Sequence, residues 1–216
     1  MKIVIADKSH SIYAELICET IAEAAKVRGT GIAKRQPEYI ITKMENGNAV
    51  IALEGDQFAG FCYIEAWSHG KFVANSGLIV HPDFRNLGLA KQIKKVIFNH
   101  SRTKFPESKV FSITTGLAVM KMNSELGYKP VTFSELTDDQ SFWKGCQTCK
   151  NFDVLTRTEQ KMCLCTGMLY DPAKAEIPKP QEHIKERAYD KKVWTRLKLI
   201  KQNMFLKKDN KDEASN

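Results

Sequence analysis

The chain has 216 residues, of which 43% are hydrophobic and 27% are charged, so it can form one domain of about 150 residues plus an extension. The net charge is +8, but the excess is local, because residues 179–208 hold ten Lys and Arg against three Asp and Glu. No apolar run approaches the roughly 20 residues that span a bilayer, and the first apolar run is too short for a secretory leader. We therefore expect a soluble cytoplasmic protein that makes no membrane contact.

Hydrophobic periodicity and turn residues predict helices and strands throughout the first 133 residues. In chain order, we expect a strand at 2–6, helices at 11–27 and 37–45, two strands within 48–67, a strand at 72–80, a helix at 88–100, a strand at 109–115, a helix at 117–126 and a strand at 128–133. The short links between the three middle strands indicate an antiparallel meander. This order predicts an α+β fold of three layers, in which helices cover both faces of a mixed, mostly antiparallel sheet.

The composition changes after residue 136. We predict a core domain at 1–136, a cysteine-rich knuckle at 137–172, a linker at 173–181, a basic amphipathic helix at 182–207 and a disordered tail at 208–216. The basic helix carries one apolar stripe, which favours packing on its own domain or on a second copy in a homodimer. We consider nucleic acid the less favoured partner for it.

The segment 79–95, IVHPDFRNLGLAKQIKK, joins a predicted strand to an amphipathic helix and contains Arg85-x-x-Gly88-x-Ala90. The first turn of a helix offers unpaired backbone N–H groups and a partial positive charge, which together bind phosphate. Gly88 and Ala90 leave room for a ligand on that turn, and Arg85 adds a permanent charge. So short a pattern also occurs in ordinary surface turns, but its place between a strand and a helix favours an anion site.

These residues resemble the coenzyme A motif of the GNAT superfamily of N-acyltransferases, [QR]-x-x-G-x-[GA], and the predicted order of elements over about 1–135 is similar to that fold. The resemblance implies acetyl-CoA as the co-substrate, with its pyrophosphate on Arg85, Asn86, Leu87, Gly88, Leu89 and Ala90. It implies that the backbone of Leu78, Ile79 and Val80 pairs with the pantetheine arm and holds the acyl carbonyl. The resemblance also implies that the strand at 109–115 splays away and leaves a V-shaped cleft.

The catalytic residues are less clearly indicated. Many members of the superfamily use a tyrosine acid four residues before the glycine of a YEKLGF-like segment, whereas this chain has Asn123 there, in NSELGY. Asn123 can donate a hydrogen bond to the thioester sulfur but cannot protonate it. Glu65, on a central predicted strand, is the best candidate for the base that deprotonates the amine, although a strand glutamate can equally face solvent.

Four of the six cysteines, Cys146, Cys149, Cys163 and Cys165, form two close pairs separated by thirteen residues. Two such pairs can bind one tetrahedral zinc ion through four thiolates. The second pair has only one residue between its cysteines, which lowers the specificity of the pattern, and buried reduced thiols or a redox pair remain alternatives. With or without zinc, we predict that this segment is an appended knuckle that covers the cleft or builds the acceptor pocket.

Taken together, these features predict an N-acetyltransferase of the acyltransferase class that modifies the amine of a small molecule, such as the amino acid glutamate. The sequence does not distinguish acetyl from succinyl or other donors, and it leaves protein amines open as acceptors. The alternative is a CoA-fold binding module that contacts nucleic acid or protein through the knuckle and the basic helix. The intact Arg85 motif opposes this alternative, because a non-enzyme has no need of a phosphate site.

Overall fold

The computed structural model describes residues 1–28, 35–147 and 149–175. Met1–Ala175 forms one compact unit. The predicted basic helix at 182–207, the predicted tail at 208–216 and most of the predicted linker lie outside the described residues. No helix in the described ranges combines the length and the hydropathy that a membrane crossing requires.

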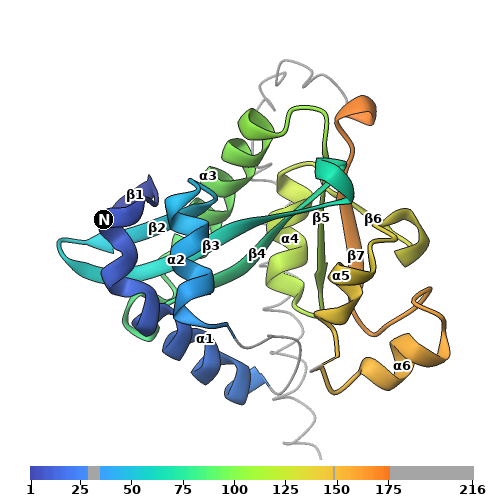
Figure 1. Cartoon of the computed structure of the whole chain (residues 1–216), viewed down its shortest axis with the longest axis horizontal. Helices are drawn as coiled ribbons and strands as arrows, with labels where there is room; N and C mark the ends of the chain where they lie inside the picture. Colours follow the sequence, from blue (N-terminus) through green and yellow to red (C-terminus); the bar gives the residue numbers. More distant parts are fainter. Residues whose placement is uncertain (29–34, 148, 176–216) are drawn as a thin grey trace, which may run out of the picture. The chain divides into compact units, whose positions relative to one another are not determined.

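A seven-stranded sheet in the order β1-β2-β3-β4-β5-β7-β6 organises this unit (Figure 1). The strands are β1 Lys2–Ile5, β2 Ala49–Glu54, β3 Gln57–Trp67, β4 Phe72–Val80, β5 Lys109–Thr114, β6 Lys129–Val131 and β7 Thr166–Tyr170. Neighbouring strands run antiparallel except for β4 and β5, which are parallel. The mixed, mostly antiparallel sheet of the predicted fold is therefore confirmed.

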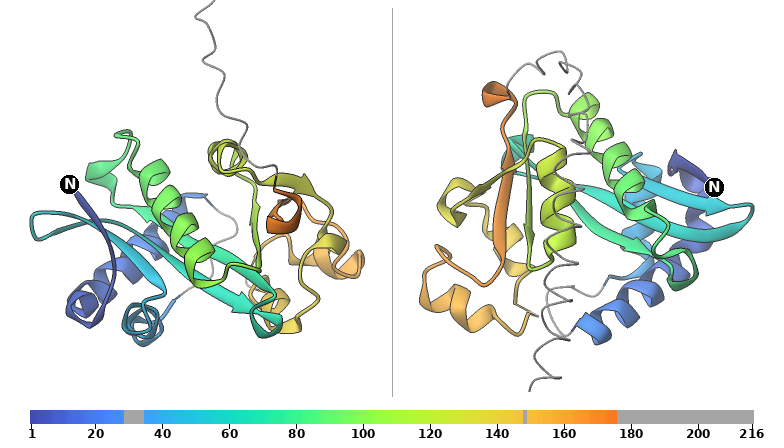
Figure 2. Two further views of the ribbon diagram at one scale, coloured as in Figure 1. Left: turned by 90° about the horizontal axis from the view of Figure 1, so that it is seen from above. Right: turned by 180° about the vertical axis from the view of Figure 1, so that it is seen from behind.

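Helices cover both faces of the sheet. The α-helices are α1 Ala14–Arg28, α2 Pro37–Glu45, α3 Leu89–Lys104, α4 Leu117–Glu125, α5 Gln140–Lys144 and α6 Phe152–Arg157. Short 3₁₀ turns occupy Lys8–Tyr13, Ser68–Gly70, Pro82–Phe84, Phe133–Glu135 and Pro172–Lys174. Figure 2 shows α1 and α2 on one side of the strands and α3 on the other, as a three-layer fold requires.

The alternation of side chains along β4 assigns each helix to a face. Val73 packs in the cluster that contains Ile93 and Ile97 of α3. Phe72 and Ala74, its neighbours, point the other way and pack in a cluster that contains the buried Trp143 of α5 and Leu155 of α6. The pair α5 and α6 therefore covers the same face as α1 and α2, farther along the sheet.

The segment at 137–172 was expected to be appended to a core that ends at residue 136. The structure does not confirm this, because β7 lies inside the sheet and pairs with β5 on one side and β6 on the other. Met168 and Leu169 of β7 are buried in two of the core clusters. Only the part between β6 and β7, which carries α5, α6 and the four cysteines, stands outside the sheet.

Candidate active site

The site lies where β4 and β5 separate. The two strands pair in parallel through Phe72–Lys109, Val73–Val110 and Ala74–Phe111, and the described strands show no β4–β5 pair beyond this point. β4 nevertheless continues to Val80, bonded to β3 along its other edge. Residues 75–80 therefore turn one backbone edge toward a V-shaped gap, where the peptide-like amides of a ligand can find partners.

A bulge distorts β4 inside this gap. Phe61 pairs with Ile79 and Tyr63 pairs with Ser76, so β4 has one residue more than β3 between these pairs. Gly77 has a φ of +65°, which disfavours residues that carry a Cβ. A Cβ at Gly77 would lie 2.3 Å from Cε1 of Tyr63, so only glycine fits here. Sequence reasoning missed this position, although a glycine inside a predicted strand is a known sign of a bulge.

The predicted phosphate loop follows directly. Gly88 is the N-cap of α3 with φ +73°, and Asn86 is also left-handed, with φ +64°. The backbone N–H groups of residues 86–90 donate to no other group among the described residues. Arg85 is exposed, and its Nε donates to the carbonyl of Val80 at 3.3 Å. A helix start with unpaired donors beside a guanidinium fits a diphosphate.

The loop residues differ in what they can offer a ligand. Leu89 is only 2% exposed and its side chain belongs to the core, so only its backbone can take part. Leu87 is exposed. A Cβ at Gly88 would meet nothing within 4 Å. Position 88 therefore requires glycine for its backbone conformation, and the open space next to it is accessible to a ligand.

A cavity of about 960 Å³ opens from the gap. Tyr63, Glu65 and Trp67 line it from alternate positions of β3, so they share one face of the sheet. Leu78 and Ile79 line it from β4, whereas Val80 and residues 85–90 do not. The predicted CoA-binding residues thus divide between a strand edge at the cavity and a loop beyond it.

Glu65 combines the properties of a base near neutral pH. It lines the cavity, and its Oε2 lies 3.0 Å from the Lys43 Nζ of α2, with both side chains about 15% exposed. Burial raises the pKa of Glu65 to about 7, against the opposing effect of the Arg35 guanidinium. Burial, and then the charge of Arg35, lowers the pKa of Lys43. The sequence did not indicate Lys43, because no pattern links α2 with β3.

Arg35 and two tyrosines line the cavity beside Glu65. Nε of Arg35 donates to the hydroxyl of Tyr63 at 2.6 Å, and its guanidinium lies 5.6 Å from the ring centre of Tyr39. Burial raises the pKa of the Tyr63 hydroxyl, while Arg35 opposes that rise. Sequence reasoning missed all three residues, since arginine and tyrosine carry no signal of function without their neighbours in space.

The structure gives no support to a catalytic role for Asn123. Its side chain is fully buried, and its Nδ2 contacts Sδ of Met168 on β7 at 3.7 Å. It does not line the cavity. The position four residues before the glycine of NSELGY thus faces the inside of the protein, and the tyrosines at the cavity come from α2 and β3 instead.

The four predicted zinc ligands come together at the far end of the same cavity, which all of them line. Burial and then the neighbouring thiolates raise the pKa of Cys146 to about 11 and that of Cys165 to about 12. The N–H of Asn151 donates to Sγ of Cys149 at 3.5 Å. Within the described ranges, however, no three His, Cys, Asp or Glu side chains are arranged to hold a metal ion.

Comparisons with known proteins agree with this geometry. Residues 19–115 match the model of the acetyltransferase (GNAT) family. No curated protein matches the chain. N-acetylglutamate synthase of Neisseria gonorrhoeae, solved with coenzyme A and N-acetylglutamate, superposes with a TM-score of 0.56 at 14% identity, over 79% of this chain and 34% of its own.

Two further structures match over nearly their whole length. YncA of Salmonella typhimurium, solved with its cofactor acetyl-CoA, has a TM-score of 0.56 and 15% identity, over 83% of this chain and 98% of its own. Rv2747 of Mycobacterium tuberculosis, solved with CoA, has a TM-score of 0.54 and 14% identity, over 79% and 99%. Residues 19–115 therefore match a GNAT acetyltransferase domain, which indicates an enzyme of the acyltransferase class, and the chain shares its fold with these solved structures.

Proposed function

We propose that this enzyme transfers an acetyl group from acetyl-CoA to the primary amine of a small molecule, and that the acceptor is an α-amino acid. The observation that carries the proposal is the strand opening at Ala74, which joins two complementary half-sites. The loop at 85–90 lies beyond one end of β4, and the N–H groups of residues 86–90 have no acceptor in the described ranges. The cavity that contains Glu65 lies on the face covered by α1 and α2.

The residues present fit acetyl-CoA. The N–H groups of residues 86–90 and the charge of Arg85 would hold the diphosphate. The free edge of β4 at residues 78–80 would pair with the pantetheine amides and direct the thioester toward the bulge at Gly77. Backbone N–H groups at this edge are suited to stabilise the negative oxygen that forms on the acyl carbon.

Glu65 supplies the base in this scheme. An ammonium group cannot attack a thioester until it has lost a proton, and a carboxylate whose pKa lies near 7 accepts that proton efficiently at neutral pH. The contact with Lys43 at 3.0 Å favours the ionised carboxylate. The thiolate of CoA then leaves as the amide bond forms. A thiol is acidic enough to leave without a dedicated acid, which fits the absence of tyrosine at position 123.

Arg35 supports an acceptor that carries a carboxylate. It lines the cavity within hydrogen-bond distance of Tyr63, two residues from Glu65 along β3. A guanidinium and a carboxylate that line one cavity can pair with the carboxylate and the amine of one α-amino acid. Glutamate is the acceptor suggested by the sequence, and N-acetylglutamate is the ligand named for the Neisseria synthase.

The experiment is the release of free CoA thiol from acetyl-CoA in the presence of amino acids and other amines, with succinyl-CoA as the alternative donor. Turnover with an amino acid, lost in Glu65→Gln, supports the proposal. Turnover with no amine, or only with lysine-containing peptides, contradicts it. A shift of the melting temperature by acetyl-CoA, measured in parallel, reports whether the co-substrate binds at all.

The zinc site has weaker support. All four cysteines line one cavity, as a shared site requires, but their arrangement does not hold a metal in the described residues. Metal analysis of the purified protein tests this prediction. One zinc per chain with thiols that resist titration supports a structural site, and four reactive thiols without zinc exclude it.

A further inference from the structure

The floor of the cavity changes in character along β3. Tyr63, Glu65 and Trp67 share one face of the strand, so consecutive members lie about 7 Å apart along it. Arg35 lies at the Tyr63 end. The Trp67 end belongs to an aromatic cluster. The carboxylate of Glu65 therefore lies between a cationic end and an apolar end.

The apolar end is built from aromatic rings that pack edge to face. The ring of Phe142, on α5, lies 5.2 Å from that of Trp67 and 4.9 Å from that of Phe111, on β5. Phe111 is fully buried, whereas Trp67 and Phe142 are only partly buried and line the cavity. Phe152 of α6 is also partly buried and lines it. These rings leave apolar surface that a ligand can cover.

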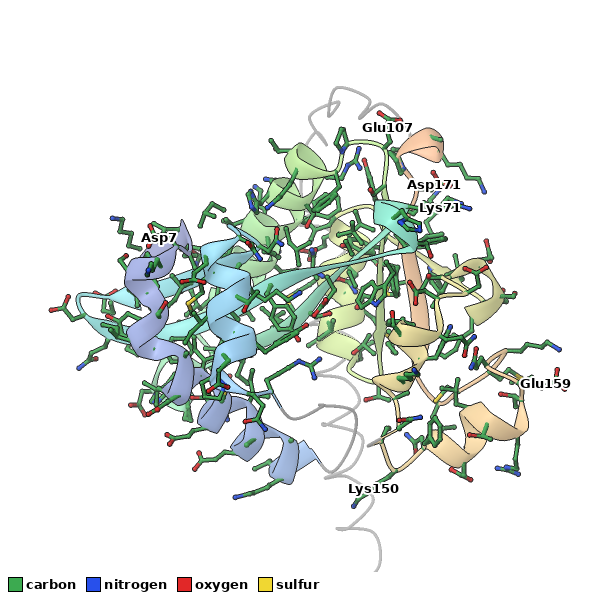
Figure 3. The ribbon with its side chains drawn as sticks, in the orientation of Figure 1. Asp7, Lys71, Glu107, Lys150, Glu159 and Asp171 are labelled. Carbon is green, nitrogen blue, oxygen red and sulfur yellow. The ribbon has the colours of Figure 1, made fainter. Side chains whose placement is uncertain are left out.

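Within the part of the chain that the structure describes, no charged side chain lines the apolar end. Among the described residues that line the cavity, Arg35 and Glu65 are the charged side chains, and those contributed by residues 111–165 are all uncharged. Figure 3 labels two charged residues of the segment between β6 and β7, Lys150 and Glu159, and both lie on its outer surface.

This distribution determines which substituent an acceptor can carry. An amino acid whose carboxylate reaches Arg35 and whose amine reaches Glu65 points its side chain toward Trp67 and Phe142. A second carboxylate there would lose its water without gaining a cation from the described residues that line the cavity, which is strongly unfavourable. A cationic side chain would find Glu65, which already contacts Lys43. An uncharged apolar or aromatic group meets surface of its own kind.

We infer that the acceptor is an α-amino acid with a large apolar or aromatic side chain, and that the enzyme discriminates against glutamate. This inference rests on the proposed function and narrows its substrate class. The aromatic subsite formed by Trp67, Phe142 and Phe152, with the buried Phe111 packed behind it, selects the side chain. Specificity of this kind arises because the charged side chain of a competing amino acid would have no partner at the apolar end of the cavity.

The test compares kcat/KM for L-phenylalanine and L-leucine with kcat/KM for L-glutamate, L-lysine and L-arginine, with acetyl-CoA at saturation. We expect at least a tenfold preference for the apolar amino acids. Phe142→Ala should raise the KM for phenylalanine about tenfold or more. The matched control is Phe105→Ala, a partly buried ring outside the cavity, which should leave this KM unchanged.

Adding a positive charge to the aromatic subsite provides a sharper test. Phe142→Arg, or Phe152→Arg should the first variant fail to fold, places a cation at the apolar end and should shift the preference toward glutamate. Higher kcat/KM for glutamate, lysine or arginine in the native enzyme overturns the inference and leaves acyl transfer to amino acids standing. If no amine is acetylated, the proposed function fails, and the aromatic subsite is then tested by calorimetry of the CoA-loaded protein. Binding of phenylalanine without binding of glutamate supports the subsite. Binding of neither amino acid overturns it.

Discussion

The two halves of the proposed site, which we call the backbone side (the edge of β4 and the loop at 85–90) and the acceptor side (the cavity), offer different kinds of group to a ligand. Toward the CoA motif, the groups available to the ligand are largely backbone groups, from a strand edge and a helix start that are continuous in sequence over residues 75–90. Toward the acceptor, they are side chains from α2, β3, β5 and the segment between β6 and β7. The first arrangement depends on local conformation, and the second depends on which distant elements the fold brings together.

This contrast makes glycine the vulnerable residue on the backbone side. Gly77→Ala should have the largest effect of any single substitution considered, because the new Cβ would lie 2.3 Å from the ring of Tyr63 at a φ of +65°. Strain and overpacking together should lower the free energy of unfolding by about 2–4 kcal/mol. Chemical denaturation measures this change, and acyl transfer should be lost with it.

The matched control is Gly55→Ala, in the turn between β2 and β3. Gly55 has a similar φ of +57°, but nothing lies within 4 Å of a Cβ there. It should therefore lose only about 1 kcal/mol from backbone strain. Equal losses at the two positions would contradict the close packing of Tyr63 against the bulge.

On the acceptor side, the largest effect belongs to Glu65. Glu65→Gln keeps the shape but removes the base, so kcat should fall by about 10²–10⁴-fold. In the native enzyme, the rate should rise as the pH increases through about 7, since the carboxylate must be ionised to accept the proton. Steady-state rates between pH 5.5 and 9 measure both effects. A variant that keeps the native rate and the native pH profile would remove Glu65 from the mechanism.

Gly88→Ala separates ligand binding from folding. Its φ of +73° and the empty space around it match those of Gly55, so both alanine variants should lose about 1 kcal/mol of stability. Only Gly88→Ala should raise the KM for acetyl-CoA, by about tenfold, since its methyl group and altered backbone would oppose the diphosphate. The same KM in both variants would show that the diphosphate lies elsewhere.

The sequence predicted the backbone side and the acceptor side unequally for the same physical reason. The strand, the loop and α3 were predicted correctly because their signals, an apolar run, Gly88 and an amphipathic period, lie within about 30 residues. Glu65 was singled out only as a carboxylate on a strand. Lys43, Arg35 and the aromatic subsite could not be predicted, since their proximity depends on packing between elements far apart in the chain.

The lack of a local signal also explains why the sequence did not predict β7. β7 was missed because the four cysteines drew attention to the segment before it, and because its five residues, TGMLY, have little periodicity of their own. Its position between β5 and β6 reverses the order of the last two strands relative to the chain. Such a crossover leaves no local signal, so the segment between β6 and β7 was predicted as an appendage to the core. The same prediction placed this segment over the cleft or in the acceptor pocket, and its residues line the cavity.

A smaller effect is expected from Lys43, which tests how a neighbouring side chain changes the pKa of Glu65. Lys43→Met removes the ammonium that lies 3.0 Å from Glu65, so the ionised carboxylate loses a favourable contact and its pKa should rise further. The pH at which the rate reaches half its maximum should therefore move up by about 1 unit, with little change in the plateau. Lys26→Met, an exposed lysine of α1, is the control. An unchanged profile would show that the pair is broken when substrates bind.

The smallest effect concerns Lys94, a side chain on the otherwise backbone-built side. It is 2% exposed on α3, with its Nζ 3.5 Å from Oδ1 of Asn75 and 5.2 Å from the ring centre of Tyr128. Burial lowers the pKa of Lys94 to about 8, with Cys62 opposing.

Between about pH 8 and 10.5, the unfolded chain therefore binds more protons at Lys94 than the folded protein does. In this range Lys94 makes the free energy of unfolding rise with pH, by at most about 1.4 kcal/mol per pH unit. Lys94→Met should abolish that rise and leave the protein at least as stable at pH 7, because a buried charge with no carboxylate partner among the described residues is replaced by an apolar chain of similar length. Denaturation at pH 7 and pH 9 measures the difference. A less stable variant at pH 7 would show that the ammonium holds Asn75 at the point where β4 leaves β5, and that the backbone side also depends on a distant side chain.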